Sequence, residues 1–311
     1  MRPGEEYPGT LDRSIAALLG LAIGDALGAP VEGRERDDYP RMRDFAAGGT
    51  HGLAAGEWTD DTAMAICLAE SLVAQGGMDE RDLLARFLRW HRLGENACGG
   101  RAVGISSTTR RVLEAFESTG RLDAAREIGN AGNGCIMRLA PVAIFHRQAP
   151  MMAREAAVRQ ARVTHGSEEA VAAAALLSEM LVAALGCDGL DAVTAAGTGS
   201  AHADLVDIAA GAYRSKARAA ISSAPRARDT LEAALWCLHR ARDFEAAVIE
   251  AVNLGGDTDT IGAVTGQLAG ALFGTAAIPR RWLAGLHSAG RLAGLARQLH
   301  AGEPGAAVSN L

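Results

Sequence analysis

The stretch that decides the fold is residues 257–274, which reads DTDTIGAVTGQLAGALFG. Its apolar residues recur at helical spacing, so we expect a helix over residues 259–273. Thr265 and Gln267, with the acidic residues just upstream, indicate the core of a soluble protein rather than a membrane span. Glycines at every fourth position would let this helix touch another backbone to backbone, and they are Gly262, Gly266, Gly270 and Gly274. Such close packing would hold the residues at the start of the helix rigidly.

A second acidic cluster, Thr59-Asp60-Asp61-Thr62, mirrors Asp257-Thr258-Asp259-Thr260 and also opens an apolar, helix-like run. One carboxylate is enough to cap a helix start, where the dipole and the free N–H groups favour it. Four aspartates and four threonines instead indicate a site for a hard divalent cation, if the two helix starts meet. Close carboxylates need compensating charge, which one or two metal ions would supply. The alternative is two independent N-caps with solvated acids.

The composition bounds the class of protein. The chain has 311 residues, 49% hydrophobic but only 4% aromatic, which supports one large core or two modest domains built by close backbone approach. A net charge of −6 without a long basic run excludes a nucleic-acid-binding footprint. The polar, acidic first residues do not resemble a signal peptide. Five cysteines without a CxxC spacing indicate reduced thiols and a cytoplasmic location, and they are Cys67, Cys98, Cys135, Cys187 and Cys237.

Almost every apolar stretch has helical spacing, and convincing strands with a period of two are absent. We therefore expect a compact all-α fold in a single domain over residues 1–311, with its core at residues 12–300. Residues 14–31 are apolar, but Asp25 and three glycines interrupt them, so we expect a buried helix and no membrane span. Residues 187–228 are expected to hold loops and poorly packed helices. The remaining helices are expected at residues 12–28, 61–75, 79–93, 107–118, 136–147, 151–162, 167–185, 229–240, 243–252 and 279–300.

Five motifs together resemble the ADP-ribosylglycohydrolase family. Residues 20–32, GLAIGDALGAPVE, are similar to the opening motif of that family. Residues 58–62, WTDDT, and residues 253–260, NLGGDTDT, resemble its two metal motifs. Residues 132–138, GNGCIMR, and the pair Thr164-His165 resemble its ADP-ribose-binding segments. The motifs occur in the order of the family and span residues 12–275.

The resemblance implies an all-α fold around a central cleft with two Mg²⁺ or Mn²⁺ ions. It also implies hydrolysis of the bond that joins C1″ of ADP-ribose to an acceptor, either a protein side chain or a small molecule, which reverses mono-ADP-ribosylation. Asp60, Asp61 and Glu32 are the catalytic residues that it suggests, although a glutamate at position 32 is also what an exposed loop would carry. The six implied metal ligands are Thr59, Asp60, Asp61, Asp257, Asp259 and Thr260.

The implied substrate contacts lie in the glycine-rich loop 129–134 and at His165. Gly132 and Gly134 would let backbone N–H groups approach a phosphate or ribose closely. Asn133 can donate to and accept from ribose hydroxyls. His165 matches the ribose or phosphate contact of the family, although a lone histidine is more often structural. We therefore expect ADP-ribose, or an ADP-ribosylated protein or small molecule, as the binding partner.

Two positions depart from the family pattern. Gly104 stands where many relatives have the aspartate of Asp-Ile-Gly-Asn-Thr-Thr, so we expect a gap the size of that side chain. Without this acid a guanidinium acceptor loses a partner, and we expect arginine-linked substrates to be cleaved slowly. Arg226 maps to a position that often holds tyrosine, and it could stack on adenine or pair with pyrophosphate.

Two other classes of function stay open on the sequence. The chain could be a non-catalytic, ADP-ribose-binding member of the family, which Gly104 favours and the intact aspartates disfavour. It could also be another hydrolase with a dinuclear metal centre, such as a phosphoesterase. The sequence leaves the acceptor and the oligomeric state open.

Overall fold

Two helices that carry glycines, α1 (Thr10–Gly28) and α13 (Thr258–Phe273), touch backbone to backbone in the computed structural model. A Cβ atom added to Gly24 would lie 2.0 Å from the carbonyl oxygen of Gly262, and one added to Gly266 would lie 2.0 Å from that of Gly20. The glycine stripe predicted for the second helix therefore finds its partner in the first. Gly274 takes no part, because it ends α13 with a φ of 74°.

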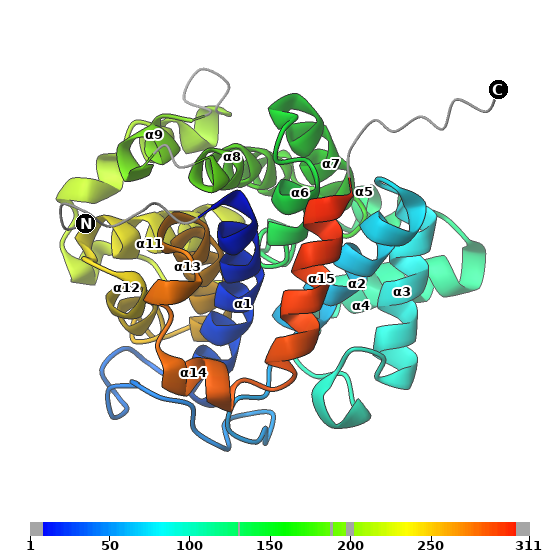
Figure 1. Cartoon of the computed structure of the whole chain (residues 1–311). Coiled ribbons are helices and arrows are strands. Elements are labelled where there is room, and N and C mark those ends of the chain that lie inside the picture. Colours follow the sequence, from blue (N-terminus) through cyan, green and yellow to red (C-terminus); the bar gives the residue numbers. More distant parts are fainter. Residues whose placement is uncertain (1–8, 130, 187–188, 197–201, 303–311) are drawn as a thin grey trace.

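The remaining helices pack around this pair, and α1 runs between α13 and α15 (Figure 1). The structure describes residues 9–129, 131–186, 189–196 and 202–302. Short 3₁₀ turns, including η1 (Ala29–Val31) directly after α1, connect several helices. The other α-helices are α2 (Asp60–Gln75), α3 (Glu80–Leu93), α4 (Ser107–Thr119), α5 (Ala124–Ile128), α6 (Ala140–Phe145), α7 (Pro150–Arg162), α8 (Glu168–Leu185), α9 (Gly189–Ala195), α10 (Val206–Ala209), α11 (Ala227–Arg240), α12 (Phe244–Ala251), α14 (Arg280–Gly285) and α15 (Ala289–Ala301).

Helix α1 is long and apolar enough to cross a membrane, but it is a core helix. Of its most apolar window, 89% is buried inside the protein. Helices α13 and α15 cover it from two sides (Figure 1). The expectation of a buried helix over residues 14–31 is confirmed, and the described residues contain no strand, only two isolated bridges.

Two predicted helices are wrong in extent. The helix expected at 136–147 begins only at Ala140, because the N–H groups of Ile136 and Met137 both donate to the carbonyl of Asn133 and form a turn. The helix expected at 279–300 is two helices, since Ser288 has a φ of 48° and the N–H of His287 donates to Gly56. The described parts of residues 187–228 hold short helices and turns, as expected.

Replacing Gly266 by alanine tests the backbone contact. We expect Gly266→Ala to lower the free energy of unfolding by about 1–3 kcal/mol, because the new methyl group meets a carbonyl oxygen that belongs to another helix. Gly294 in α15 is the matched control, since a Cβ there meets nothing within 4 Å. Gly294→Ala should raise the stability by about 0.5–1 kcal/mol. Denaturant unfolding measures both, and two changes of the same sign would contradict the close contact.

Candidate functional site

Asp25, in the last turns of α1, organises the first acidic cluster. One of its carboxylate oxygens accepts from the N–H and the hydroxyl of Thr59, both at 2.9 Å. The other accepts from the N–H of Thr62 at 3.0 Å and from its hydroxyl at 2.6 Å. The buried carboxylate of Asp25 thus accepts hydrogen bonds from N–H groups at the start of α2, where the helix itself offers no acceptor. Asp60 and Asp61 lie between these two fixed points.

The second cluster is fixed to the end of the same helix. A Cβ on Gly28 would lie 2.4 Å from the backbone nitrogen of Asp259, so the start of α13 touches α1. The hydroxyl of Thr258 donates to the carbonyl of Gly28 at 2.9 Å. The N–H of Asp257 donates to the carbonyl of Ser223 at 3.1 Å. Thr62 and Thr258 therefore serve the ends of helices, as expected.

The two acidic clusters meet. The hydroxyl oxygen of Thr59 lies 3.3 Å from a carboxylate oxygen of Asp61 and 3.4 Å from one of Asp259. Carboxylate oxygens of Glu32, Asp257 and Asp259 all lie within 4.8 Å of one another. The alternative of two independent, solvated N-caps is excluded by this convergence.

The convergence concentrates negative charge in a place of low exposure. Burial, then the charges of Asp25 and Glu32, raises the pKa of Asp60 to about 8. Burial also raises the pKa values of Asp61 and Asp259 well above the ordinary range, and that of Asp257 to a smaller extent. In the described chain none of these four aspartates forms a salt bridge to arginine or lysine.

The donor set fits divalent cations. One carboxylate oxygen of Asp61 is buried and has no hydrogen-bond partner among the described residues. Buried acceptors of this kind are rarely left unsatisfied, and a cation satisfies carboxylates that no donor reaches. The other predicted ligands bring further carboxylate and hydroxyl oxygens to the same cluster. Thr260 adds to them from the first turn of α13, where its N–H donates to Asp259 at 2.9 Å.

A cavity of about 290 Å³ opens over the acidic cluster. Its walls include Glu32, Asp60, Asp257, Asp259 and Thr260 on one side. The predicted substrate residues form other parts of the same wall, and they are Gly104, Gly132, Asn133, Gly134 and His165. One cavity thus joins the two groups of residues that the sequence placed in separate motifs. Residue 130 of the glycine-rich loop lies outside the described residues.

Asn133 connects the glycine-rich loop to the acidic cluster. Its amide nitrogen donates to the hydroxyl of Thr230 at 2.8 Å and also to a carboxylate oxygen of Asp257. Both amide hydrogens are therefore used. The expectation that Asn133 both donates to and accepts from substrate is corrected, because only its carbonyl oxygen remains available. Thr230, at the start of α11, was not identified from the sequence, where it is one of several threonines beside a helix.

A hydrogen-bonded chain sets the state of His165. Arg138 is buried, stacks over Phe87 at 4.7 Å and donates to the hydroxyl of Thr164 at 2.8 Å. That hydroxyl lies 2.8 Å from Nδ1 of His165, which is its only acceptor among the described residues. Nδ1 therefore accepts, and the ring proton sits on Nε2 beside Gly134. Burial, reinforced by the charge of Arg138, lowers the pKa of His165 to about 3, so the ring is a neutral donor.

Glu32 lies in the cavity wall rather than in an exposed loop. One of its carboxylate oxygens is 2.8 Å from Nε2 of His51. This hydrogen bond raises the pKa of His51, while its partial burial opposes the shift. His51 belongs to an irregular segment before α2 with no recognisable pattern, so sequence reasoning gave no reason to select it.

Gly104 does not leave the expected gap. Its φ is 84°, which disfavours any residue with a side chain, and an added Cβ would lie 2.0 Å from Oδ1 of Asp60. The backbone at position 104 instead presses directly on the acidic cluster. The predicted space for a missing aspartate is therefore wrong, because Asp60 fills it.

Arg226 contacts the glycine-rich loop through its backbone and not through its side chain. Its guanidinium pairs with Glu169 at 2.7 Å and is 54% exposed, and it does not line the cavity. Residues 226 and 132 form an isolated bridge, and the N–H of Ala227 donates to Ala131 at 3.0 Å. The structure thus does not bring this side chain to the substrate residues. It shows instead that the backbone at Arg226 holds the glycine-rich loop.

We compared the chain with protein-family models, with known proteins and with solved structures. Residues 6–307 match the family model described as ADP-ribosylglycohydrolase. The chain is 42% identical over 274 residues to the ADP-ribosylarginine hydrolase Tri1 of Pseudomonas putida (strain GB-1), covering 88% of this chain and 74% of that protein. It is 34% identical to the ADP-ribosyl-[dinitrogen reductase] glycohydrolase of Rhodospirillum rubrum, with 90% and 92% covered. A solved structure titled "ADP-ribosylglycohydrolase-related protein complex" matches with a TM-score of 0.84 at 42% identity, covering 94% of this chain and 98% of that one.

The hydrogen-bonded chain to His165 is open to a direct test by ¹⁵N NMR of the imidazole. We expect neutral His165 with its proton on Nε2, without titration between about pH 5 and 8. Thr164→Val should disturb that tautomer and lower the stability by about 1–3 kcal/mol, because Arg138 loses a buried acceptor. Thr164→Ser is the control and should keep both properties. A proton on Nδ1, or an ordinary histidine titration, would contradict the assignment.

Proposed function

Because this chain belongs to the ADP-ribosylglycohydrolase family, we propose that it hydrolyses the bond between C1″ of ADP-ribose and an arginine side chain of a modified protein. The observation that carries the proposal is the convergence of both acidic helix starts with Asn133 and His165 around one cavity. The arginine acceptor is supported by the name of one relative, an ADP-ribosylarginine hydrolase, and a modified protein as the target by the name of the other, an ADP-ribosyl-[dinitrogen reductase] glycohydrolase.

The reaction places distinct demands on these residues. Water adds to C1″, the bond from C1″ to the guanidinium nitrogen breaks, and a proton from the water passes to the departing nitrogen. Positive charge develops on the distal ribose as the bond breaks, and nearby carboxylates stabilise such charge. The carbonyl of Asn133 accepts from a ribose hydroxyl, and Nε2–H of His165 donates to a phosphate or ribose oxygen. Glu32, held by His51, orients the attacking water and takes its proton.

Divalent cations complete the proposal. The six residues that would hold them are the ones selected from the sequence: Thr59, Asp60, Asp61, Asp257, Asp259 and Thr260. Two Mg²⁺ or Mn²⁺ ions would supply positive charge beside the ribose hydroxyls and acidify a nearby water. The orphaned oxygen of Asp61 and the raised pKa values of the aspartates support this part of the proposal. We further propose that the protein acts on mono-ADP-ribosylated targets in the cytoplasm, where its free cysteines stay reduced.

The expectation of slow cleavage of arginine-linked ADP-ribose is not carried into this proposal. It rested on the missing acid and on an empty space at position 104, and the carboxyl group of Asp60 occupies that space. The carboxyl group of Asp60, which lines the cavity beside Gly104, is available to accept a hydrogen bond from a guanidinium acceptor. Two alternatives, a non-catalytic binding protein and a phosphoesterase, are decided by the experiment that follows.

The test is release of ADP-ribose from an arginine-linked substrate, followed by chromatography in the presence of Mg²⁺. Asp60→Asn and Asp259→Asn should each lower kcat/KM by more than about 100-fold, since even outer-shell partners of a metal contribute roughly 10- to 100-fold. Asp38→Asn is the control, because Asp38 is exposed and its one ion pair among the described residues is with Arg34. Binding of ADP-ribose without release would favour the non-catalytic alternative. Turnover of p-nitrophenyl phosphate without turnover of the arginine-linked substrate would favour a phosphoesterase.

Metal removal should act on stability in a way that depends on pH. The folded chain keeps protons on carboxylates with raised pKa values, such as Asp60 at about 8, whereas the unfolded chain releases them near pH 4. Stability without metal must then fall as pH rises through this window. We expect a chelator to lower the Tm more at about pH 8.5 than at about pH 5.5. This difference between the two pH values should be smaller in Asp60→Asn. An equal effect at both pH values would contradict the carboxylate cluster as the metal site.

A further inference from the structure

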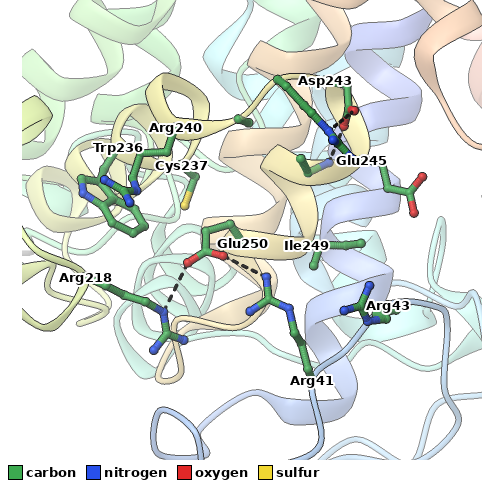
Figure 2. Close-up of a pocket in the computed structure, with 13 residues that line it drawn as sticks. Arg41, Arg43, Arg218, Trp236, Cys237, Arg240, Asp243, Glu245, Ile249 and Glu250 are labelled. Atoms are coloured by element: carbon green, nitrogen blue, oxygen red, sulfur yellow. Dashed lines mark hydrogen bonds and ion pairs between the residues drawn. The ribbon is translucent and has the colours of Figure 1, made fainter.

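A second pocket, separate from the cavity over the acidic cluster, is rich in arginine (Figure 2). It has a volume of about 510 Å³ and shares no lining residue with the cavity described above. It is formed by α11, α12, the loop between them and residues 41 and 43 of the segment before α2. Five arginines and three carboxylates line it. The pocket thus has an excess of positive charge, although the chain as a whole has a net charge of −6.

One carboxylate stands among the arginines and serves two of them. Figure 2 shows Glu250 pointing between Arg218 and Arg41. Its two oxygens lie 3.3 Å from Nε of Arg218 and 2.9 Å from Nη2 of Arg41. One negative charge therefore faces two guanidinium groups at the wall of the pocket. Among the described residues, the second carboxylate that pairs with Arg218 is that of Asp37, which is 71% exposed.

The other two carboxylates each pair with one arginine, Asp243 with Arg242 of the pocket and Glu245 with an arginine outside it. Asp243 caps α12, where it accepts from the N–H of Ala246 at 2.8 Å, and it pairs with the neighbouring Arg242. Glu245 pairs with Arg281, which does not line the pocket. Among the described residues, neither carboxylate pairs with Arg41, Arg43, Arg218 or Arg240.

Two arginines of the pocket, Arg43 and Arg240, form no ion pair among the described residues. The guanidinium of Arg240 lies over the ring of Trp236, 5.0 Å from its centroid, which fixes its plane and leaves its N–H groups free. Trp236 and Ile249 are buried and give the pocket an apolar floor. A low-dielectric floor strengthens the attraction between the arginines and an anion.

We propose that this pocket binds a small molecule that carries one or more phosphate groups. Guanidinium groups form paired hydrogen bonds with phosphate oxygens. Several arginines in one pocket therefore suit a ligand with more than one negative charge better than they suit a ligand with a single carboxylate. The volume is large enough for the two phosphates of an inorganic pyrophosphate group. Arg43 and Arg240 supply the free donors and the unpaired charge, and Arg41 and Arg218 lie beside them in ion pairs with Glu250 and Asp37.

The pocket adjoins the segment that leads into the second acidic cluster. Arg218 donates from Nη2 to the carbonyl of Asn253. Arg36 donates to the carbonyl of Arg218 and, at 2.6 Å, to that of Leu254. These contacts hold the carbonyl groups of Asn253 and Leu254, in the segment that leads to Asp257. An anion in the pocket and the acidic cluster therefore share one structural support.

Isothermal titration calorimetry with inorganic phosphate and with inorganic pyrophosphate tests the proposal, at an ionic strength matched by chloride. We expect saturable binding of one anion per chain, with pyrophosphate tighter than phosphate. Arg43→Gln and Arg240→Gln should each weaken binding by about tenfold or more, because a hydrogen bond to a charged group is lost. Arg297→Gln, an exposed arginine of α15 with the same change of charge, should bind as the unchanged protein does.

Three results would overturn the proposal. The first is heat that chloride reproduces, because it would show only ionic-strength effects. The second is an equal loss in Arg297→Gln, which would show attraction to overall charge rather than to a pocket. The third is unchanged affinity in Arg43→Gln and Arg240→Gln, which would place the anion elsewhere, such as in the cavity over the acidic cluster. Circular dichroism of each variant verifies that these exposed side chains were replaced without unfolding.

Discussion

The approach of α1 to α13 without intervening side chains is the constraint on which the rest of the structure depends. Each of Gly20, Gly24 and Gly28 meets backbone atoms of α13 where a Cβ would stand. This contact fixes the position of α13 along the axis of α1 and so places Asp259 beside the end of α1. Asp25, on the same helix, then fixes the start of α2 through four hydrogen bonds. One helix therefore positions both acidic clusters, which explains how residues two hundred positions apart in sequence form one site.

This arrangement concentrates charge at the expense of stability. Burial and mutual repulsion raise the pKa of Asp60 to about 8 and the pKa values of Asp61 and Asp259 well above their ordinary range. Such strain is common where a protein prepares a site for a cation or a developing positive charge. The rigid glycine contact and the buried network around Asp25 keep the acids together. His165 is the complement, since its neutral Nε2–H offers a donor without adding charge.

Much of this could be predicted from the sequence, because the decisive patterns are local. The glycine stripe of α13, the two acidic clusters and the apolar spacing of most helices follow from residue type and period. What failed depends on contacts between distant segments. Gly285 and Gly290 flank Ser288, but they do not locate the break, which is held by a hydrogen bond from the N–H of His287 to the distant Gly56. The space at Gly104 could not be known without the side chain of Asp60, and the partner of Arg226 is Glu169 in another helix.

The most direct measurement of the central claim is anomalous X-ray scattering from crystals grown with Mn²⁺. The account predicts anomalous density among the carboxylate and hydroxyl oxygens of Asp60, Asp61, Asp257 and Asp259, with Thr59 and Thr260 beside it, at a position that touches both α2 and α13. The density should disappear in crystals of Asp259→Asn that remain folded. Anomalous density elsewhere with none at this position, or no density at a saturating concentration of Mn²⁺, would contradict the claim that the two helix starts form one metal site.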